Sequence, residues 1–292
     1  MLTAEQIESY KRRGYVVARG VFSQKEIEEL RRVADEFVER SRSAVDHTEF
    51  FDLEPSHTAD HPRLRRLKNP VRAHPVFDAA LRHAPLLDIV EQLIGPGVRF
   101  NGDKLNMKSG GYGSPVEWHQ DWAFYPHTHD GLLAAGVALD DMTLENGCLL
   151  MVPGSHKGPV YDHHQDGVFI GAVTDPRFDP AAETIDSIQM RAGSVSLHHV
   201  RAVHGSAPNR SSSPRRLLLF QYAAMDAWPL LGIESWKAFQ DTILRGEPVW
   251  EPHMENVPTR IPLPPPPRAG SIYEIQTQLS DSLRVLSNHS GG

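Results

Sequence analysis

Apolar residues near the start of the chain recur with the period of an α-helix. Across residues 21–42 the apolar positions fall on one helical face behind the cap residue Ser23, and they are Ile27, Leu30, Val33 and Phe37. A capping-box pattern that opens at Thr3 predicts another helix over residues 3–14. Glycines bound the apolar segment between these helices, so we expect a short strand over residues 14–20.

The pattern changes along the next hundred residues. A His- and Asp-rich loop over 43–62 leads to two more short helices, expected over 74–97. From Val98 onward apolar and polar residues alternate with a period of two, as in a half-buried strand. Gly, Pro, Asn and Asp turns separate the segments with this alternation, which are 98–111, 132–139, 147–155, 193–199, 202–208 and 215–225. Many short strands at such spacing indicate a β-sandwich or barrel.

These patterns predict a mainly β protein with flanking helices, in the α+β class, whose N-terminal helices pack on the β core. We expect residues 1–292 to act as one functional unit. Its expected parts are a largely helical N-terminal part, a β core, a possible lid, and a Pro-rich connector with a tail, over residues 1–97, 98–225, 226–260 and 261–292. The Ser- and Gly-rich last dozen residues are typical of a loosely held tail.

Composition narrows the class of protein. The net charge is −7 at pH 7 and no basic run suits a phosphate backbone, so nucleic acid is not an expected partner. The longest apolar stretch, LLLFQYAAM, is too short to span a bilayer, and charges interrupt the apolar run that an N-terminal signal peptide requires. Cys148 is the only cysteine, which excludes an intrachain disulfide and fits a reducing compartment. We therefore expect a cytoplasmic protein without a membrane partner.

Histidines and carboxylates suggest a metal site, but chance must be considered first. With 16 His and 37 acidic residues, His-x-Asp/Glu triplets are expected at random, and four occur: His47/Glu49, His119/Asp121, His164/Asp166 and His253/Glu255. On a strand, His119 and Asp121 would project to the same face and could bind one ion together. His204, near the end of a short apolar strand, is the candidate third ligand. Two histidines and one carboxylate form the ligand set of non-haem Fe(II) oxygenases.

Two of these triplets share the letters HQD, and their positions distinguish them. His119 lies 85 residues before His204, which leaves room for several strands and turns, whereas His164 lies only 40 residues before it. The segment around His164 also lacks a flanking strand pattern. We therefore expect the metal at His119 and Asp121, and a polar loop at His164 and Asp166.

An iron oxygenase of this kind needs a bidentate co-substrate, usually 2-oxoglutarate, whose distant carboxylate must be neutralised. A guanidinium does this well because its planar fork makes charge-assisted hydrogen bonds. Arg215 opens the apolar strand RRLLLFQY, which we expect to pair antiparallel with the strand of His204. Its neighbour Arg216 is expected to be a solvated charge.

Several blocks in a fixed order then resemble the phytanoyl-CoA dioxygenase family. They are HQD at 119–121, NGCLLMVPGSHKG at 146–158, HGSAPN at 204–209 and the arginine at 215, and the opening helix-strand-helix extends the similarity to about residues 2–225. The resemblance implies a double-stranded β-helix, a jelly roll of the cupin type, that uses Fe(II), 2-oxoglutarate and O2.

The same resemblance implies roles for particular residues. It makes His119, Asp121 and His204 the iron ligands, and it makes Arg215 and Ser206 contacts of the distal carboxylate of 2-oxoglutarate. It also assigns further contacts or active-site cations, which are Asn106, Lys104 and Lys68. Asn106 matches a 2-oxoglutarate-contacting position in the ectoine hydroxylase branch of the family.

Other side chains allow two interpretations from the residues alone. Lys104, Asn106 and Lys108 share one face of a strand, which either lines the barrel mouth or faces solvent. Tyr125 either packs in the core or contacts substrate. A histidine of the pair His198 and His199 either supports the metal ligands or is structural. Two larger groups are also open to interpretation. An apolar group could form a lid, and it consists of Trp228, Trp236 and Phe239. A basic group could receive an anionic substrate such as a CoA ester or could be solvated, and it consists of Arg63, Arg65, Arg66 and Lys68.

The predicted reaction follows from the ligand set. We expect hydroxylation of an unactivated C–H bond in a small-molecule metabolite, with release of succinate and CO2, and 2-hydroxylation of an acyl-CoA is the alternative. Halogenases on this scaffold have a small residue in place of the carboxylate ligand, so Asp121 favours hydroxylation, or a related desaturation or epoxidation, over halogenation. A Zn(II) hydrolase with the same ligands and a non-catalytic jelly-roll binding module remain as other classes, and the bound metal distinguishes them.

Overall fold

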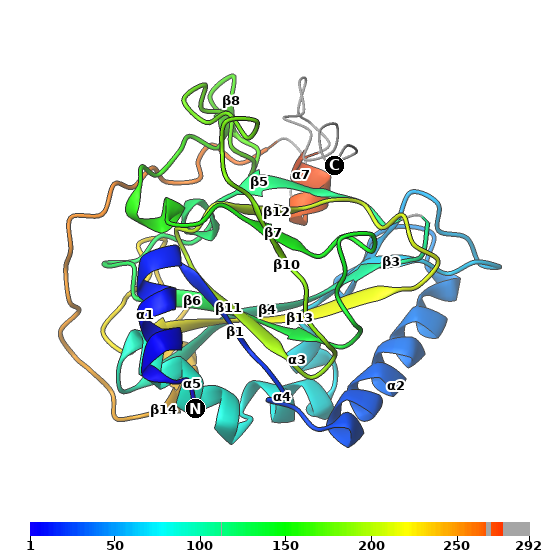
Figure 1. Ribbon diagram of the computed structural model, residues 1–292, viewed down its shortest axis with the longest axis horizontal. Coiled ribbons are helices and arrows are strands. Elements are labelled where there is room, and N and C mark those ends of the chain that lie inside the picture. The colour runs from blue at the N-terminus through cyan, green and yellow to red at the C-terminus, as the bar shows by residue number, and fades with distance from the viewer. Residues whose placement is uncertain (112, 267–269, 277–292) are drawn as a thin grey trace.

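Two antiparallel β-sheets lie face to face, and helices cover the outer face of the larger one (Figure 1). The structure is a computed structural model that describes residues 1–111, 113–266 and 270–276. The larger sheet has the order β1-β11-β6-β13-β4-β3-β2, with β14 beside β4. Its strands are β1 (Tyr15–Ala18), β2 (Phe51–Leu53), β3 (Leu64–Lys68), β4 (Val98–Lys108), β6 (Leu132–Ala138), β11 (Val195–His199), β13 (Arg215–Ala224) and β14 (Ile243–Arg245).

The smaller sheet has the order β10-β7-β12-β5 and lies above the larger one in Figure 1. Its strands are β5 (Val116–His119), β7 (Leu149–Met151), β10 (Asp186–Ile188) and β12 (His204–Ser206). A separate hairpin joins β8 (His164–Gln165) and β9 (Val168–Phe169). The architecture is the jelly roll with flanking helices that the sequence predicts.

Helices form in the N-terminal segments where the sequence predicts them, and their apolar faces pack on the larger sheet. Three further short helices, over 70–73, 236–241 and 272–276, were not predicted. Capping boxes close the starts of the first two helices, through Thr3 with Gln6 and Ser23 with Glu26. The buried face of the second helix meets Phe77 and the outer face of the sheet in one core cluster. The helices are α1 (Ala4–Arg13), α2 (Gln24–Arg40), α3 (Pro70–Ala73), α4 (Pro75–Leu81), α5 (Ala84–Ile94), α6 (Trp236–Asp241) and α7 (Ile272–Gln276).

Strand β13 shows how one sequence serves both faces of the larger sheet. Leu218, Phe220 and Tyr222 are buried in the cluster formed with the helices. The alternate residues Leu217 and Leu219 point the other way and pack with residues of the smaller sheet. The space between the sheets is therefore lined by every second residue of the central strands.

The structure corrects two expectations about strand pairing. The segment expected as a loop over 43–62 contains β2, which pairs with β3 and extends the larger sheet beyond β4. The strand of Arg215 does not pair with the strand of His204, because β13 pairs with β4 and β6 whereas β12 pairs with β5 and β7. Arg215 and His204 thus belong to opposite sheets. Closeness in the sequence does not predict this pairing, because the chain passes from one sheet to the other between β12 and β13.

Residues 226–260, expected as a lid, form α6, β14 and their connections. Trp228 packs on Trp236 and Phe239, with ring centroids 5.9 and 5.2 Å away. The guanidinium of Arg99 lies 4.0 Å from the centre of the Phe239 ring, so this cluster packs beside the end of β4. β14 pairs with the same end of β4.

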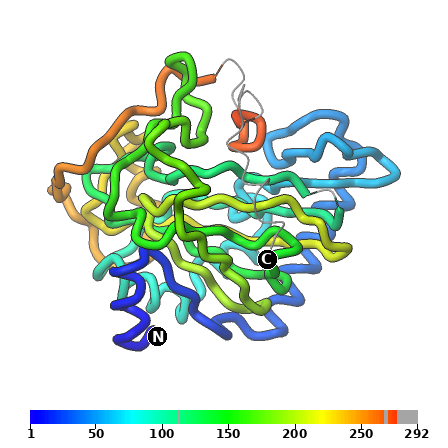
Figure 2. The backbone as a smooth tube through the Cα atoms, turned by 45° about the horizontal axis from the view of Figure 1, so that its top comes forward, coloured from blue at the N-terminus to red at the C-terminus, as the bar shows by residue number. Residues whose placement is uncertain are grey.

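The following segment leads to α7, the last element described. Residues 246–266, orange in Figure 2, run along the outer edge of the molecule before α7. Gln276 of α7 accepts a hydrogen bond from the backbone of Glu117 in β5 (3.0 Å), and Ser271 donates one to Asp52 in β2. α7 therefore bridges the edges of the two sheets. The last dozen residues, expected to be a loosely held tail, lie outside the described residues.

No helix in the described part of the chain has both the length and the apolar character needed to cross a bilayer.

Packing between the helices and the larger sheet can be tested at Phe77, which is fully buried in α4. Phe77→Ala should lower the free energy of unfolding by about 3–5 kcal/mol, because it removes apolar contacts and leaves a cavity. Leu231→Ala, at a residue 50% exposed, should change it by less than about 0.5 kcal/mol. Denaturant unfolding monitored by circular dichroism measures both, and similar losses would contradict this packing.

Candidate metal centre

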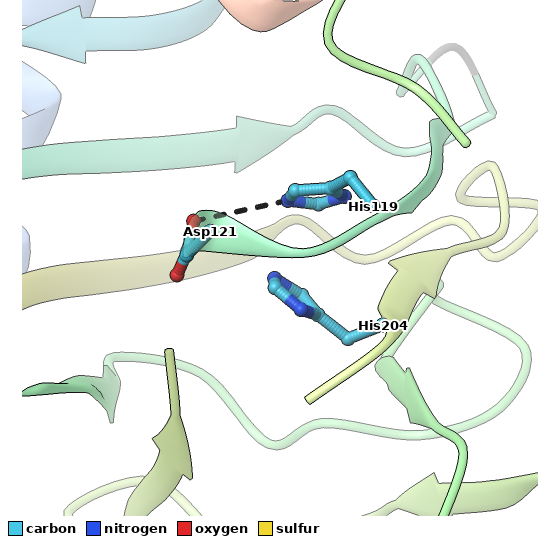
Figure 3. A group of neighbouring side chains, drawn as sticks. All are labelled: His119, Asp121 and His204. Atoms are coloured by element: carbon cyan, nitrogen blue, oxygen red, sulfur yellow. Dashed lines mark ion pairs between the residues drawn. The ribbon is translucent and has the colours of Figure 1, made fainter. Parts of the chain in front are cut away.

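Three side chains converge between the sheets (Figure 3). His119 is the last residue of β5 and His204 is the first of β12, and the two are directly paired across these strands. Asp121 lies 4.0 Å from His119, measured from Oδ1 to Nε2. One potential ligand atom from each residue lies within 4.8 Å of the other two, so the three can bind a single metal ion.

The local backbone differs from the strand that was expected to carry both His119 and Asp121. β5 ends at His119, and Asp121 begins a 3₁₀ turn over Asp121–Ala123. Gln120 between them keeps an extended backbone, with φ −118° and ψ 127°, so the two ligands still project to the same side. The side chain of Gln120 donates hydrogen bonds to the carbonyls of Pro159 and Arg201, which fixes this linker.

Both histidines are held in the form that a metal requires. The Nδ1 of His119 lies 2.8 Å from the carbonyl oxygen of Glu117, and that of His204 lies 2.9 Å from the carbonyl oxygen of Ala202. A carbonyl can only accept, so each Nδ1 carries the proton and each Nε2 has a free lone pair. Burial lowers the pKa of His119 to about 4 and that of His204 well below its ordinary value, so both rings are neutral at pH 7.

Asp121 is ionised although it is almost fully buried. Burial would raise its pKa, but the charge of Lys104 and the contact with His198 outweigh this and hold the pKa well below its usual range. Lys104 Nζ lies 3.9 Å from Asp121 Oδ1, and His198 Nε2 lies 3.4 Å from Asp121 Oδ2. His198, which the sequence left as either a support or a structural residue, contacts both Asp121 and the ring of His204.

These three residues border a cavity between the sheets. Four other residues predicted for the site also line it, one from the smaller sheet and three from the larger: Ser206, Lys104, Asn106 and Arg215. The polar face of β4 therefore points into the cavity and not to solvent. The rest of the lining is Arg66, Val116, Leu149, His198, Gly205, Leu217, Leu219 and Ile272.

Arg215 reaches the cavity from the wall opposite β12. Its Nε donates to the carbonyl oxygen of Gly147 at 3.0 Å and its Nη2 donates to the same oxygen, which leaves Nη1 outside this pair of bonds. Gly147 adopts φ +77°, and a Cβ there would lie 2.4 Å from the carbonyl oxygen of Ala207. Only glycine fits this position without a shift of the backbone. Arg216 points the other way and is paired with Asp140 and Asp35, so it is not the solvated charge that we expected.

A buried lysine orients Ser206. Lys108 Nζ donates to Ser206 Oγ at 2.8 Å, and it also donates to the carbonyl of Ala207. The hydroxyl of Ser206 accepts this bond, so its own proton is available for a ligand in the cavity. Burial, with a contribution from Arg215, lowers the pKa of Lys108 well below its ordinary value.

Arg66 joins the site from β3, where the sequence left its role open. Its Nε donates to Asn106 Oδ1 at 2.9 Å, and it is 8% exposed. Arg66 and Asn106 are paired directly across β3 and β4, so they share a face of the sheet. A strand over the segment LRRLK places Arg65 and Arg66 on opposite faces of the sheet, and the pairing with β4 decides that Arg66 is the one facing the site.

Three residues predicted for the substrate pocket lie outside the lining of the cavity. Lys68 is the last residue of β3, half-buried near the end of the strand. Trp228 belongs to the aromatic cluster beside β4. Tyr125 packs on the cluster that contains Trp122, and burial first, then the charge of Asp121, raises its pKa well above its ordinary value. Tyr125 therefore lies next to Asp121 but outside the lining of the cavity.

Other groups of metal-binding side chains are explained differently. His164 bonds to Asp162, and neither His164 nor Asp166 belongs to a group of three possible ligands among the described residues. One further such group joins His47, Asp52 and Glu274. Its Asp52 already accepts hydrogen bonds from Arg65 and Ser271, so this carboxylate ties β2, β3 and α7 together.

A jelly roll with two neutral histidines and one ionised aspartate facing a polar cavity defines the class of non-haem iron oxygenases. The family model of phytanoyl-CoA dioxygenase matches residues 10–217. The chain belongs to the phytanoyl-CoA dioxygenase family, and it is an enzyme that depends on iron and 2-oxoglutarate.

Individual relatives agree with this assignment. The chain is 34% identical, over 95% of its length and 98% of the relative, to a probable alpha-ketoglutarate-dependent hypophosphite dioxygenase of Stutzerimonas stutzeri. It is 28% identical to an ectoine dioxygenase of Bordetella parapertussis, over 77% of this chain and 76% of that one. Its fold matches the crystal structure of EctD from S. alaskensis in its apoform, with a TM-score of 0.67, 23% identity, and coverage of 90% and 89% of the two chains.

The two HQD segments make a matched test of the metal centre. His119→Ala should abolish stoichiometric Fe(II) binding, because it removes one of the two candidate nitrogen ligands. His164→Ala, on the β8–β9 hairpin, should leave Fe(II) binding unchanged. Metal analysis after anaerobic loading and gel filtration measures both. Retained iron in the first variant and lost iron in the second would assign the site to the other HQD segment.

Proposed function

We propose that His119, Asp121 and His204 hold the Fe(II) of this enzyme. Their donor atoms support this, since two neutral imidazole nitrogens and an ionised carboxylate are the facial set that non-haem iron uses. The carbonyls of Glu117 and Ala202 fix the two rings from behind, as expected around a bound metal. The convergence of these three donor atoms within 4.8 Å carries the proposal.

The co-substrate 2-oxoglutarate is proposed to bind beside the metal, with its distal carboxylate on Arg215 and Ser206. Arg215 offers a charged donor whose orientation is set by Gly147, and Ser206 offers a hydroxyl proton. Asn106 and Lys104 are the further polar groups on the same side of the cavity. With iron and 2-oxoglutarate bound, O2 is consumed, 2-oxoglutarate becomes succinate and CO2, and one oxygen atom goes to the substrate.

The protein's own part is positioning and the exclusion of water. Leu149, Leu217, Leu219 and Ile272 give the cavity apolar walls between its polar groups. Such walls keep the reacting bond near the metal and limit access of solvent.

We propose that the reaction is hydroxylation of a small molecule. Asp121 supports hydroxylation over halogenation, because the carboxylate occupies the position that a halide would need. Relatives are named for small substrates, hypophosphite and ectoine, and this chain is proposed to act on a substrate of similar size. An acyl-CoA remains the alternative.

The remaining expectations are proposed with this function. Residues 1–292 would act as one unit, which is supported by a core cluster that helices and the larger sheet share. A cytoplasmic location is supported by Cys148, a buried free thiol. The net charge of −7 argues against nucleic acid as a partner. Three predicted pocket residues lie outside the cavity lining, and they would contact substrate only if the segments that carry them move. They are Tyr125, Lys68 and Trp228.

Anaerobic titration of the Fe(II)-loaded enzyme with 2-oxoglutarate tests the proposal. A weak visible charge-transfer band of the chelate should appear in the wild-type enzyme and in the His164→Ala variant. It should be absent from the His119→Ala variant. Failure of the wild-type enzyme to give the band would overturn the proposed function.

Neighbouring arginines test the co-substrate contact. Arg215→Gln should weaken 2-oxoglutarate about tenfold to a hundredfold while Fe(II) binding persists, because a hydrogen bond to a charged group contributes about 1.5–3 kcal/mol. Arg216→Gln is the control, since it removes the same charge one residue away on the opposite face of β13. It should lower the melting temperature without changing the dissociation constant of 2-oxoglutarate. Equal affinities in the two variants would exclude Arg215 from the contact.

A further inference from the structure

Positive side chains outnumber negative ones around the cavity. Arg66, Lys104 and Arg215 bring three positive charges to its lining, whereas Asp121 brings one negative charge. Divalent iron and the dianion of 2-oxoglutarate neutralise each other, so their binding leaves this surplus unchanged. With Arg215 and Ser206 assigned to the distal carboxylate of 2-oxoglutarate, Arg66 has no ligand under the proposed function. Lys104, named above among the polar groups near the co-substrate, is available to the same anion as Arg66.

Arg66 is buried with part of its hydrogen-bonding capacity unused. Its Nε is satisfied by Asn106, but its Nη2 is buried and has no hydrogen-bond partner among the described residues. A buried guanidinium stays charged, and an unsatisfied donor on it is costly. The nearby acid Asp52 does not neutralise it, since that carboxylate bonds to the Nε of Arg65 at 2.9 Å and to Ser271. Arg66 is therefore prepared for an anion that enters the cavity.

Lys104 and Tyr273 complete this wall. Lys104 extends from β4 on the same face as Asn106, and its carboxylate contact within the described chain is Asp121, at 3.9 Å. That distance exceeds a normal hydrogen bond, so the ammonium keeps donors for a ligand. Tyr273 of α7 lies under the guanidinium of Arg66, 5.1 Å from ring centre to Cζ. Its hydroxyl is also buried without a hydrogen-bond partner among the described residues.

We propose that Arg66 and Lys104 bind an anionic group of the substrate, a small oxyanion such as a carboxylate or a phosphinate. The inference rests on the proposed function and adds the substrate class to it. The two cations come from adjacent strands, β3 and β4, and face the cavity beside the metal ligands. Tyr273 supports the guanidinium through its ring and offers a further donor to the same anion.

The position of Lys104 also restricts where the substrate is oxidised. Its ammonium lies 3.9 Å from a carboxylate oxygen of Asp121, which is a proposed iron ligand. An anion on this ammonium is held close to the metal, so the bond that is hydroxylated must be near the anionic group. This geometry favours a short substrate over one whose anionic group is distant from the reacting bond.

Calorimetric titration without O2 tests the inference independently of turnover. The enzyme is loaded with Mn(II) and saturated with 2-oxoglutarate, and the probes are hypophosphite, acetate and the neutral acetamide. Hypophosphite or acetate should bind, and acetamide should bind at least tenfold more weakly than acetate if acetate is the ligand. Preference between the two anions then distinguishes a phosphinate from a carboxylate. Binding of neither anion, with 2-oxoglutarate bound normally, would overturn the inference and leave the proposed function intact.

Substitutions assign the site. Arg66→Gln and Lys104→Gln should each weaken the bound anion about tenfold to a hundredfold, with the dissociation constant of 2-oxoglutarate changed less than about threefold. Arg72→Gln, which removes a charge from an exposed ion pair with Glu49, should change neither. The chelate band of the Fe(II) form shows that each variant retains a folded metal centre. Unchanged anion affinity in both variants, or a loss of 2-oxoglutarate affinity in place of anion affinity, would refute this assignment.

Discussion

The two-residue alternation of strands β4 and β13 is the constraint on which the rest of the molecule depends. Both strands lie in the middle of the larger sheet, so each must bury one face under helices and present the other to the smaller sheet. Leu105 and Met107 meet the helices, whereas Lys104 and Asn106 face the cavity. A shift of one residue in the register of β4 would bury Lys104 and Asn106 in the apolar layer under the helices. The same shift would turn Leu105 and Met107 towards the cavity.

The two histidines of the proposed metal site are oriented by the backbone and not by other side chains. Each histidine is fixed by a carbonyl two residues before it, so the tautomer is determined as soon as β5 and β12 form. The carboxylate of Asp121 is instead held by two side chains, Lys104 and His198, which also line the cavity. Fixed imidazoles and an ionised carboxylate mean that little rearrangement is needed when a metal binds.

The sequence predicted the parts of this site that depend on local pattern. The order and spacing of His119, Asp121 and His204 could be predicted, as could the polar face of β4, because strand alternation is a local property. The pairing of β13 and the role of Arg66 could not, since both depend on which distant strands become neighbours. α7 was also missed, because contacts such as Gln276 with β5 and Ser271 with Asp52 join residues far apart in the chain.

The three-residue strand β12 has a consequence for how this family can diversify. His204 and Ser206 lie two positions apart on it, and β12 is held between β5 and β7. The strand therefore cannot slide or bend to suit a new substrate without disturbing both residues at once. The residues proposed to bind the substrate anion, Arg66 and Lys104, lie on other strands, so they can change while His204 and Ser206 stay the same.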